Sequence, residues 1–515
     1  QWENLSSLEG ELQLDLTLEG HAGELSGEVQ IEVGDLVFSD DSGLMAGEGL
    51  GFDIQVLFSR PGTEWYFDTL LRLSRGELLL DNFYTRLSGQ PRDIGASGFW
   101  QGSASRLMLE KFEFHHAKVL SFEGALELGF EPTPFVRTLS IDLPRTAVSP
   151  LYQHYIQGLV SGTQAEALEV NGDLTLELQW GRNLENRIDM SLFEVNLEDQ
   201  FGQFAIYGLN GALRWSDGDK AQPTRLRWSG GSIYTITLGE SALQGELFRD
   251  RFRITEPVSM PVLDGMFNLS EFQVTDFDTT PLWRVSGGLT PLSMENLCHA
   301  LGWPPFSGFL AGSIPSITYK HGQLTTSGVL VMEVFDGEAL IKDLQLLGAF
   351  SNVPELRANV EVWNMDLEQL TRAFSFGNIE GKLGGHIHEL VLQNWEPVAF
   401  DAMFATPDED DSRHRISQNA VDNLARIGGG GGALSTTFLS FLEEFSYDSL
   451  GISCRLRNGV CQMGGVTPAK QGYYIVKGGG FPPRIDVLGF NDRVAWNVLV
   501  DRLKSIATSQ APIIE

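Results

Sequence analysis

The chain has 515 residues, of which 42% are hydrophobic and 20% are charged, so its composition is that of a folded protein with room for several domains. Its 68 acidic residues outnumber its 36 basic residues, which gives a formal net charge of -32 at pH 7. This balance argues against binding to nucleic acid or to anionic lipid headgroups, because both need a basic surface. It is typical of a chain that keeps a large apolar surface soluble.

The sequence predicts no membrane-spanning helix, because it has no run of about 18 apolar residues. The chain begins at Gln1 in polar, strand-like sequence, without the basic and apolar regions of a signal peptide and without an initiator methionine. We therefore expect a mature or trimmed piece of a longer protein.

Residues 1–145 are predicted to form successive β-strands. Apolar and polar residues alternate clearly over 11–18, 29–33, 53–58 and 125–130. Period two places the apolar side chains on one face of each strand. No segment long enough for a crossover helix intervenes, so we expect antiparallel meanders.

The clearest strand of the chain begins at Val170. Apolar side chains at Leu174, Leu176, Leu178 and Trp180 alternate there with polar ones. The strand opens with the phrase apolar-x-Gly-x-apolar, in which glycine permits a kink. The phrase recurs around Gly10, Gly27, Gly124, Gly211, Gly245, Gly312 and Gly381. Because this spacing is irregular, it indicates a recurring supersecondary unit and not a strict solenoid.

Two short helices interrupt the predicted strands. Ser149 and Pro150 predict a helix over 149–160, with Ser149 as its N-cap. Strands resume over 169–285, and a second helix is predicted over 292–301. Since a helix is followed by similar strands in both places, the pattern indicates an internal duplication.

Further strands are predicted over 329–334, 358–363 and 382–392. The acidic run 408–411 is the expected boundary after them. We interpret it as a solvated linker and not as a calcium site, because the calcium-loop pattern of ligands is missing.

The tail, residues 406–515, is predicted to be a compact α+β module. Its expected elements are helices over 416–427, 434–445 and 491–506, the last capped by Asn491, and strands over 473–477 and 484–490.

Cys454 and Cys461 flank the turn sequence Arg457-Asn458-Gly459. A four-residue loop would place the two cysteines opposite each other, within disulfide reach, whereas a two-residue Asn-Gly turn would put them out of register. We expect a disulfide, which implies an oxidising compartment. Metal binding by this pair is disfavoured because no second pair or histidine is nearby. The third cysteine, Cys298, is expected to be a buried thiol.

The motifs of catalysis and phosphate binding are missing from the sequence. The glycine runs 428–432 and 478–480 lack the Lys-Ser/Thr context of a phosphate loop and are interpreted as hinges. His386 and His388 share one face of a strand, but no third ligand accompanies them. No Gly-x-Ser-x-Gly elbow occurs. We therefore predict no catalytic residue, no metal, no cofactor and no enzymatic activity.

The question for function is what covers the apolar faces. A β-sandwich would cover each with a second sheet. The alternative is an open trough that holds hydrocarbon. One acyl chain in water costs on the order of 10 kcal/mol, at about 0.8 kcal/mol per CH₂, so a lipid crossing an aqueous gap needs a continuous apolar path. The expected lining residues are Leu12, Leu14, Leu16, Leu18, Leu174, Leu176, Leu178, Val329 and Val331.

A resemblance to a known family is carried by several phrases in the second half of the chain. The phrases are Phe335-Asp336-Gly337, Leu367-Glu368-Gln369-Leu370, Phe376-Gly377-Asn378-Ile379-Glu380-Gly381, Asn394-Trp395-Glu396-Pro397-Val398-Ala399-Phe400, the segment 415–424 with the glycines after it, the segment 454–461, and the segment 472–480. From about Leu289 onward, the sequence resembles the C-terminal half of the AsmA-like proteins, and most closely the YdbH group. The first 290 residues are similar in style only.

The resemblance implies a bridge-like carrier of phospholipid in the Gram-negative envelope. Such a protein resides in the periplasm and is anchored in the inner membrane by an N-terminal helix that this chain lacks. The resemblance also implies a partner, a small outer-membrane lipoprotein that extends the sheet at the C-terminal end by β-augmentation.

We therefore expect a mainly β fold: an elongated antiparallel β-groove with an open apolar trough, a few short helices and a C-terminal α+β module. Its expected segments are 1–145, 146–290, 291–405 and 406–515. The expected function is phospholipid transport between the inner and outer membranes. The alternative is a scaffold or assembly factor for outer-membrane proteins. A glycan-binding protein is disfavoured because the tryptophans are scattered and form no platform.

Overall fold

The computed structural model describes residues 5–21, 24–81, 83–87, 89–131, 133–277, 279–303, 305–348, 351, 353–429, 443–479 and 485–508. The chain divides into two compact units. Unit 1 comprises Gln1–Tyr234 and Glu240–Glu256, and unit 2 comprises Thr235–Gly239 and Pro257–Glu515. The boundary between the units falls inside the predicted segment 146–290.

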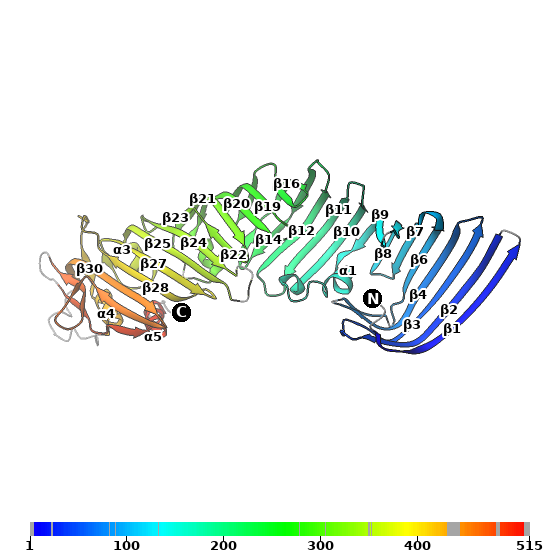
Figure 1. Cartoon of the computed structure of the whole chain (residues 1–515). Helices are drawn as coiled ribbons and strands as arrows, with labels where there is room; N and C mark the ends of the chain where they lie inside the picture. Colours follow the sequence, from blue (N-terminus) through cyan, green and yellow to red (C-terminus); the bar gives the residue numbers. More distant parts are fainter. Residues whose placement is uncertain are drawn as a thin grey trace, which may run out of the picture. The chain divides into compact units, whose positions relative to one another are not determined.

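Both units are mainly β, with antiparallel strands and a few short helices, as the sequence predicts. In unit 1, long strands follow one another along the sequence and most pair with their neighbours in the chain (Figure 1). The strands of unit 1 are β1 (Leu5–His21), β2 (Glu24–Asp40), β3 (Met45–Pro61), β4 (Trp65–Leu80), β5 (Phe83–Arg86), β6 (Arg92–Gln101), β7 (Arg106–His116), β8 (Leu120–Gly129), β9 (Phe135–Ala147), β10 (Leu168–Gly181), β11 (Arg187–Asp199), β12 (Phe204–Ser216), β13 (Gln222–Trp228), β14 (Gly230–Ile233), β16 (Ser241–Phe248) and β17 (Arg251–Ile254).

The connection from β9 to β10 is helical and differs from the predicted helix at its start. Helix α1 (Val148–Leu151) has Ala147 as its N-cap, two positions before the predicted cap Ser149. It continues as a π-helical turn, Tyr152–Ile156, and a 3₁₀ turn, Gln164–Ala167, precedes β10. A further 3₁₀ turn, Gly102–Ala104, precedes β7.

Gly172 shows what one of the recurring glycines does at the beginning of a strand. Its φ of +104° lies in a region that side chains disfavour, and a Cβ there would come within 2.5 Å of the Glu194 carbonyl oxygen. The pairing of β10 with β11 shifts register between Asn171 and Asp173. The glycine therefore sits at a β-bulge that bends the strand.

The described residues of unit 2 form shorter strands and four helices. Its strands are β15 (Ile236–Leu238), β18 (Val258–Val262), β19 (Gly265–Thr275), β20 (Leu282–Ser293), β21 (Gly308–Lys320), β22 (Gln323–Thr326), β23 (Val329–Val334), β24 (Gly337–Leu347), β25 (Glu355–Asp366), β26 (Ile379–Glu380), β27 (Lys382–Gln393), β28 (Glu396–Ala405), β29 (Arg415–Ser417), β30 (Glu444–Arg457), β31 (Val460–Gly465), β32 (Thr467–Pro468), β33 (Tyr473–Gly478), β34 (Val487–Gly489) and β35 (Arg493–Ala495). Its helices are α2 (Met294–Leu301), α3 (Leu367–Ala373), α4 (Gln418–Ile427) and α5 (Trp496–Thr508).

Three details of the predicted tail differ in the structure. Ile416 belongs to β29, and the helix begins after Ser417, whose side chain accepts a hydrogen bond from the Ala420 amide. Asn491 does not cap the last helix, because β35 intervenes before Trp496. The predicted helix 434–445 lies outside the described residues except at its end, where Phe445 is in β30.

The largest buried cluster of described side chains lies in unit 2 and gathers around α2, α3 and α4 and the last strands. Ile416, Ala420, Ile475 and Val476 are fully buried in it. The helices therefore cover one side of the C-terminal strands.

Candidate functional site

A row of mainly apolar residues crosses the sheet of unit 1 from one strand to the next. Each member is the cross-strand partner of the next, so all lie on one face. The row is Leu16, Val29, Val56, Thr69, Ala96, Phe112, Gly124, Ile141, Leu178, Ile188 and Trp215. It spans eleven strands, which corresponds to roughly 50 Å at about 4.8 Å per strand. We call it the unit 1 row.

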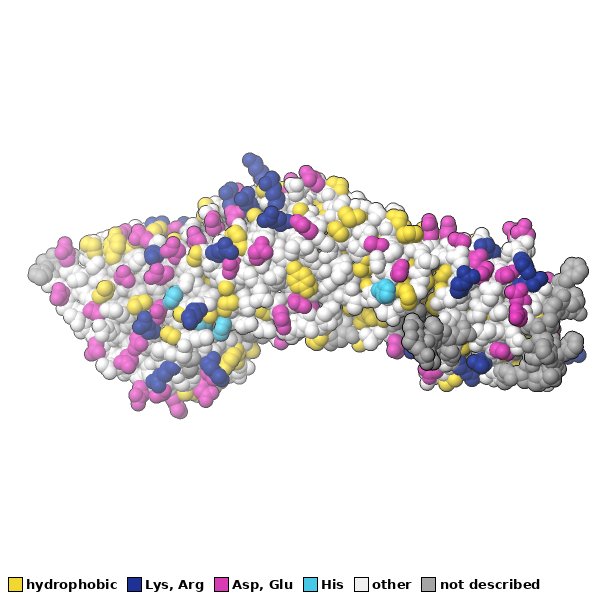
Figure 2. All heavy atoms as spheres, turned by 180° about the vertical axis from the view of Figure 1, so that it is seen from behind, with side chains coloured by type: hydrophobic (Ala, Val, Ile, Leu, Met, Phe, Trp, Pro, Cys, Tyr) yellow, Lys and Arg dark blue, Asp and Glu magenta, His cyan; other side chains and the backbone are white. Residues whose placement is uncertain are grey.

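The residues one position along from the unit 1 row form a polar row on the opposite face. These are Asp15, Gln30, Gln55, Leu70, Gly95, Glu113, Glu123, Asp142, Glu177, Asp189 and Arg214. Ion pairs cross this face, including Arg72 Nε to Asp93 Oδ1 at 2.8 Å and Arg214 Nε to Asp189 Oδ1 at 3.3 Å. On the face of the molecule drawn in Figure 2, acidic and basic side chains are widely spread between smaller hydrophobic patches. The sheet of unit 1 is therefore strongly two-sided.

The side chains of the unit 1 row are not enclosed in the way that core side chains are. None of its members is buried: Leu16 is 53% exposed, and the other members are half-buried. Central residues of a β-sandwich would be enclosed by the inner face of a second sheet. The half-buried state is what a single sheet layer gives, because each side chain is shielded mainly by its neighbours on the same face.

The structure places all seven predicted lining leucines of unit 1 on the face of this row. Leu12, Leu14, Leu16 and Leu18 lie on β1 and are 53–69% exposed. On β10, the leucines are half-buried; Leu176 and Leu178 pair with apolar residues on both sides, whereas Leu174 pairs with Leu192 on one side and Thr146 on the other. The apolar pairs of β10 are Leu174 with Leu192, Leu176 with Leu143 and Met190, and Leu178 with Ile141 and Ile188.

The two predicted lining valines of unit 2 require a correction. Val329 and Val331 pair with Ser313 and Ala311, whereas the alternate residues Leu330 and Met332 pair with Gly312 and Leu310. The more continuous apolar row of unit 2 runs through Leu330, as shown below. Val329 and Val331 therefore lie on the opposite face, because the sequence is apolar on both faces of this strand and period two gives no preference.

One part of the apolar face of unit 1 is covered, by the helical connection between β9 and β10. Val148 and Tyr152 pack there against Val170 and Val195, and all four are buried. This cover is local, because it is made by one short segment.

A polar cluster fixes this segment to the sheet, and sequence reasoning did not find it. Tyr155 accepts a hydrogen bond from Arg92 Nε at 3.3 Å and lies 2.8 Å from His116 Nδ1. Arg92 Nη2 also donates to Thr85 Oγ1 at 2.6 Å, and His116 Nε2 lies 3.2 Å from Gln90 Oε1. The only sequence signal was that Arg92 and His116 occupy apolar-face positions of their strands.

Burial lowers the pKa of His116 to about 4, and the neighbouring Arg92 guanidinium acts in the same direction. His116 is fully buried. The adjacent His115, by contrast, lies on the polar face and is exposed, so the two histidines point to opposite sides as the alternation predicts. The cluster is therefore built around a neutral imidazole.

Unit 2 has an apolar row of its own, which also crosses eleven strands. It is Met260, Phe267, Leu289, Gly312, Leu330, Ile341, Val360, Ile387, Ala402, Cys454 and Met463. Most members are half-buried, but Ala402 and Met463 are only 6% exposed. The unit 2 row therefore begins uncovered and ends under other elements.

The last members of the unit 2 row line an apolar pocket of about 450 Å³. Ile387, Ala402, Cys454 and Met463 form its floor. Its roof comes from α4 and α5, which contribute Leu424, Ile427, Trp496, Leu499 and Leu503. The pocket was not predicted from the sequence.

Cys454 and Cys461 are joined in a disulfide across the β30–β31 hairpin, with their Cα atoms 5.5 Å apart. The turn is the two-residue Asn458-Gly459, since Arg457 pairs with Val460. The cysteines are thus diagonal neighbours on one face and not directly opposed, because Cys454 pairs with Met463. The third cysteine, Cys298, is a buried free thiol, and burial raises its pKa.

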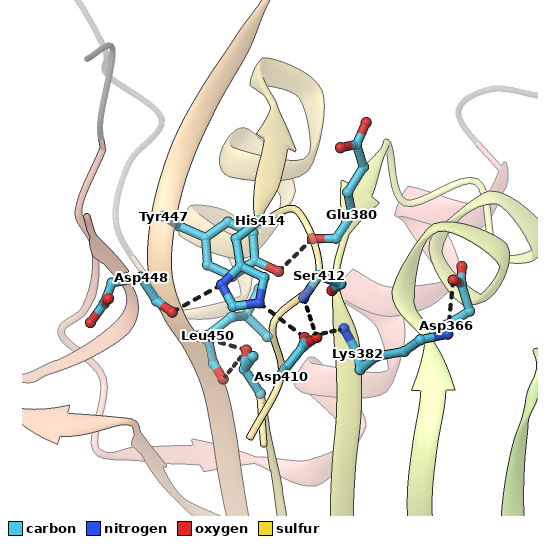
Figure 3. A network of polar contacts seen from close by, with 10 residues as sticks. Asp366, Glu380, Lys382, Asp410, Ser412, His414, Tyr447, Asp448 and Leu450 are labelled. Carbon is cyan, nitrogen blue, oxygen red and sulfur yellow. Dashed lines mark hydrogen bonds and ion pairs between the residues drawn. The ribbon is translucent and has the colours of Figure 1, made fainter. Parts of the chain in front are cut away.

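Asp410 is the exception to the interpretation of the acidic run as a solvated linker, because Asp408, Glu409 and Asp411 are exposed. Its carboxylate accepts hydrogen bonds from the Lys382 amide at 2.7 Å, the Ser412 amide at 2.9 Å and His414 Nε2 at 2.9 Å (Figure 3). Burial alone would raise the pKa of Asp410, but these hydrogen bonds outweigh it and lower the pKa to about 2. The run therefore holds the connection after β28 onto β27.

The network around Asp410 is arranged for structure and not for proton transfer. His414 Nδ1 lies 3.2 Å from the Asp448 carbonyl oxygen, so both ring nitrogens face acceptors and neither is free as a base. The Tyr447 ring stacks on His414, and its hydroxyl donates to the Glu380 carbonyl at 2.6 Å (Figure 3). Burial raises the pKa of Tyr447. The network ties β26, β27 and β30 together beneath α4.

Metal ligation and membrane crossing find no support in the described part of the chain. The rings of His386 and His388 stack with centroids 4.0 Å apart, but no group of three His, Cys, Asp or Glu side chains among the described residues could hold a metal ion. Within the same residues, every helix is too short or too polar to span a bilayer.

Comparison of the chain with protein-family models, with curated proteins and with solved structures finds no match.

Proposed function

We propose that this protein carries lipids between membranes, with their acyl chains held on the apolar face of its sheet. The observation that carries the proposal is the unit 1 row: nine of its eleven strands present an apolar side chain on one face, and none of these side chains is buried. A large exposed apolar surface on a soluble protein marks a binding site, because it costs stability unless something occupies it.

The chemistry of both faces agrees with a lipid cargo. A hydrocarbon chain has no polar group to satisfy, and Thr69 is the one polar side chain among the eleven residues of the row. The opposite face is rich in carboxylates and ion pairs, which keeps that side in water. The row binds by area and not by directional bonds, so a chain can slide along it without breaking a hydrogen bond.

The resemblance to the AsmA-like family adds the cargo, the compartment and the direction of the path to the proposal. The cargo is then phospholipid, the compartment is the periplasm, and the path leads from the inner to the outer membrane. The Cys454–Cys461 disulfide supports an oxidising compartment. In the same proposal, a small outer-membrane lipoprotein adds a strand at the C-terminal end.

The test replaces Leu176, which pairs with Leu143 and Met190 on the apolar face, by arginine. A charge in the path should block lipid passage while leaving the protein folded, because the position is half-exposed. Glu177→Arg is the matched control, since the neighbouring side chain lies on the polar face between Asp142 and Asp189. The measurement is phospholipid transfer between two vesicle populations, together with native mass spectrometry of the purified chain.

Lost transfer and lost co-purified phospholipid in Leu176→Arg, with both retained in Glu177→Arg, would support the proposal. Purified protein that holds no phospholipid but holds an outer-membrane barrel precursor would favour an assembly factor instead. Unfolding of Leu176→Arg alone would show that this face is ordinary core.

A further inference from the structure

The pocket of unit 2 differs from the open stretches of the two apolar rows because it has a roof. Its floor is the end of the unit 2 row, and α4 and α5 lie over it. Of the sixteen residues that line it, only Ser453 is polar, and no polar surface is open to the pocket. Its volume of about 450 Å³ is within the range of sites for small molecules.

The roof is held in place by specific contacts. Asn423 of α4 donates through its side chain to the Phe376 carbonyl oxygen at 2.9 Å. Arg502 of α5 donates to the carbonyl oxygens of Arg426 and Ile427 at the end of α4, both at 3.4 Å. A cation at a helix C-terminus is also favoured by the helix dipole. The two helices therefore form a fixed lid over the pocket and not a loose one.

The pocket is continuous with the uncovered part of the unit 2 row. Cross-strand pairing leads without interruption from Leu330 through Ile341 and Val360 to Ile387, which is already a lining residue. An apolar chain lying on the row could therefore reach the pocket without leaving apolar contact.

The lining selects among possible occupants. A peptide segment would bring backbone N–H and C=O groups into a pocket that offers no partner for them, and each unpaired group carries a large desolvation penalty. A headgroup would suffer the same penalty. A hydrocarbon chain carries no such group, and each buried methylene adds to its affinity.

We propose that this pocket holds the end of a single lipid acyl chain, so that a lipid on the unit 2 row is arrested there with its headgroup outside. The inference rests on the proposed function in one respect, because the lipid that reaches the pocket is the lipid that the apolar rows are proposed to carry. It adds a defined binding site at which lipid is held before leaving the protein.

The experiment uses lysophosphatidylcholines of increasing acyl length, which have one chain and no net charge and so avoid repulsion by the acidic protein. Calorimetry on the whole chain should show affinity rising about fourfold per added methylene and then levelling off once the pocket is full. A lysophosphatidylcholine with a diazirine at the end of its acyl chain should label peptides of β27, β28 and α5.

Two variants of α5 provide the control. Leu503 lines the pocket and is 41% exposed, whereas Val498 does not line it and is 40% exposed. Leu503→Arg should reduce pocket labelling at least tenfold and remove the dependence on chain length. Val498→Arg should leave both unchanged, which shows that a charge on α5 does not by itself disturb the unit.

Equal labelling of the pocket in Leu503→Arg, or no labelling of pocket peptides in the unmodified protein, would overturn the inference. A dimer that Leu503→Arg dissociates, without any labelling, would instead assign the pocket to a second copy. The two proposals can fail separately. If the pocket stays unlabelled but unit 1 is labelled, and Leu176→Arg removes that labelling, the transport proposal stands. Pocket labelling without vesicle transfer would support the acyl-chain site and contradict the transport proposal.

Discussion

The two apolar rows are built alike and end differently. Each crosses eleven antiparallel strands and presents alternate side chains on one face, but the unit 1 row contains no buried residue, whereas the unit 2 row ends at Ala402 and Met463 beneath α4 and α5. The difference does not come from the strands, whose patterns are similar. It comes from the helices α4 and α5, which cover one end of a sheet that would otherwise be open.

This comparison shows how one sequence pattern serves two purposes. A covered face contributes hydrophobic stabilisation in proportion to the area it buries, and an open face contributes less. Unit 1 therefore depends more on its hydrogen-bonded ladder and on local fixings such as the Arg92–His116–Tyr155 cluster.

Truncation of a leucine should be costly under the roof and mild on the open row. Leu456→Ala removes a fully buried side chain from unit 2 and should destabilise that unit by about 3 kcal/mol or more. Leu178→Ala on the half-exposed row should cost unit 1 about 1 kcal/mol. Denaturant dependence of amide hydrogen exchange, followed on peptides from each unit, measures both. Equal losses would mean that the unit 1 row is covered after all.

Mild acid should weaken unit 1 before unit 2. The pKa of His116 is about 4 in the folded state against an ordinary 6.5, so the unfolded chain takes up a proton that the folded chain does not. The stability that neutral His116 contributes to unit 1 is fully present above pH 6.5. Roughly 3 kcal/mol of it is lost as the pH falls to about 4.

The matching group in unit 2 is Asp410, whose pKa is lowered from 3.8 to about 2. Its contribution, about 2 kcal/mol, is present above pH 3.8 and is lost only as the pH falls toward 2. Hydrogen exchange at a series of pH values should therefore show unit 1 loosening first. His116→Gln should remove the upper transition, and a transition that persists in that variant would contradict the assignment.

Reduction should affect unit 2 alone. Opening the Cys454–Cys461 bond releases a closed loop with a sequence separation of seven, and the chain-entropy model assigns such a loop about 2.5 kcal/mol. Dithiothreitol leaves both side chains in place, so packing is nearly unchanged. Hydrogen exchange should increase in β30 and β31 and stay constant in unit 1, and a comparable increase in unit 1 would contradict the assignment.

Substitution on the polar face should have the smallest effect. Arg72 pairs with Asp93 at 2.8 Å, but its side chain is 54% exposed. Arg72→Ala should therefore change the stability of unit 1 by less than about 1 kcal/mol, and it should leave lipid transfer unchanged. A strong loss of transfer in this variant would mean that cargo travels on the polar face.

The alternation of residues was sufficient to predict the strands and, for unit 1, the face to which Leu12 and Leu178 belong. It gave the wrong face for Val329 and Val331, because their strand is apolar on both faces and alternation then cannot indicate which face is which. It also failed for Asp410, because an acidic run looks the same whether its carboxylates are solvated or accept three hydrogen bonds.

The sequence by itself determined a mainly β, antiparallel protein with a two-sided sheet, since side-chain direction in a strand depends only on neighbours along the chain. It also brought Cys454 and Cys461 onto one hairpin. Which apolar side chains are covered depends on the packing of the folded chain, because the covering residues are distant in sequence. The roof of α4 and α5 over Ile387 and Cys454, and the attachment of Tyr155 to Arg92 and His116, are both contacts of that kind.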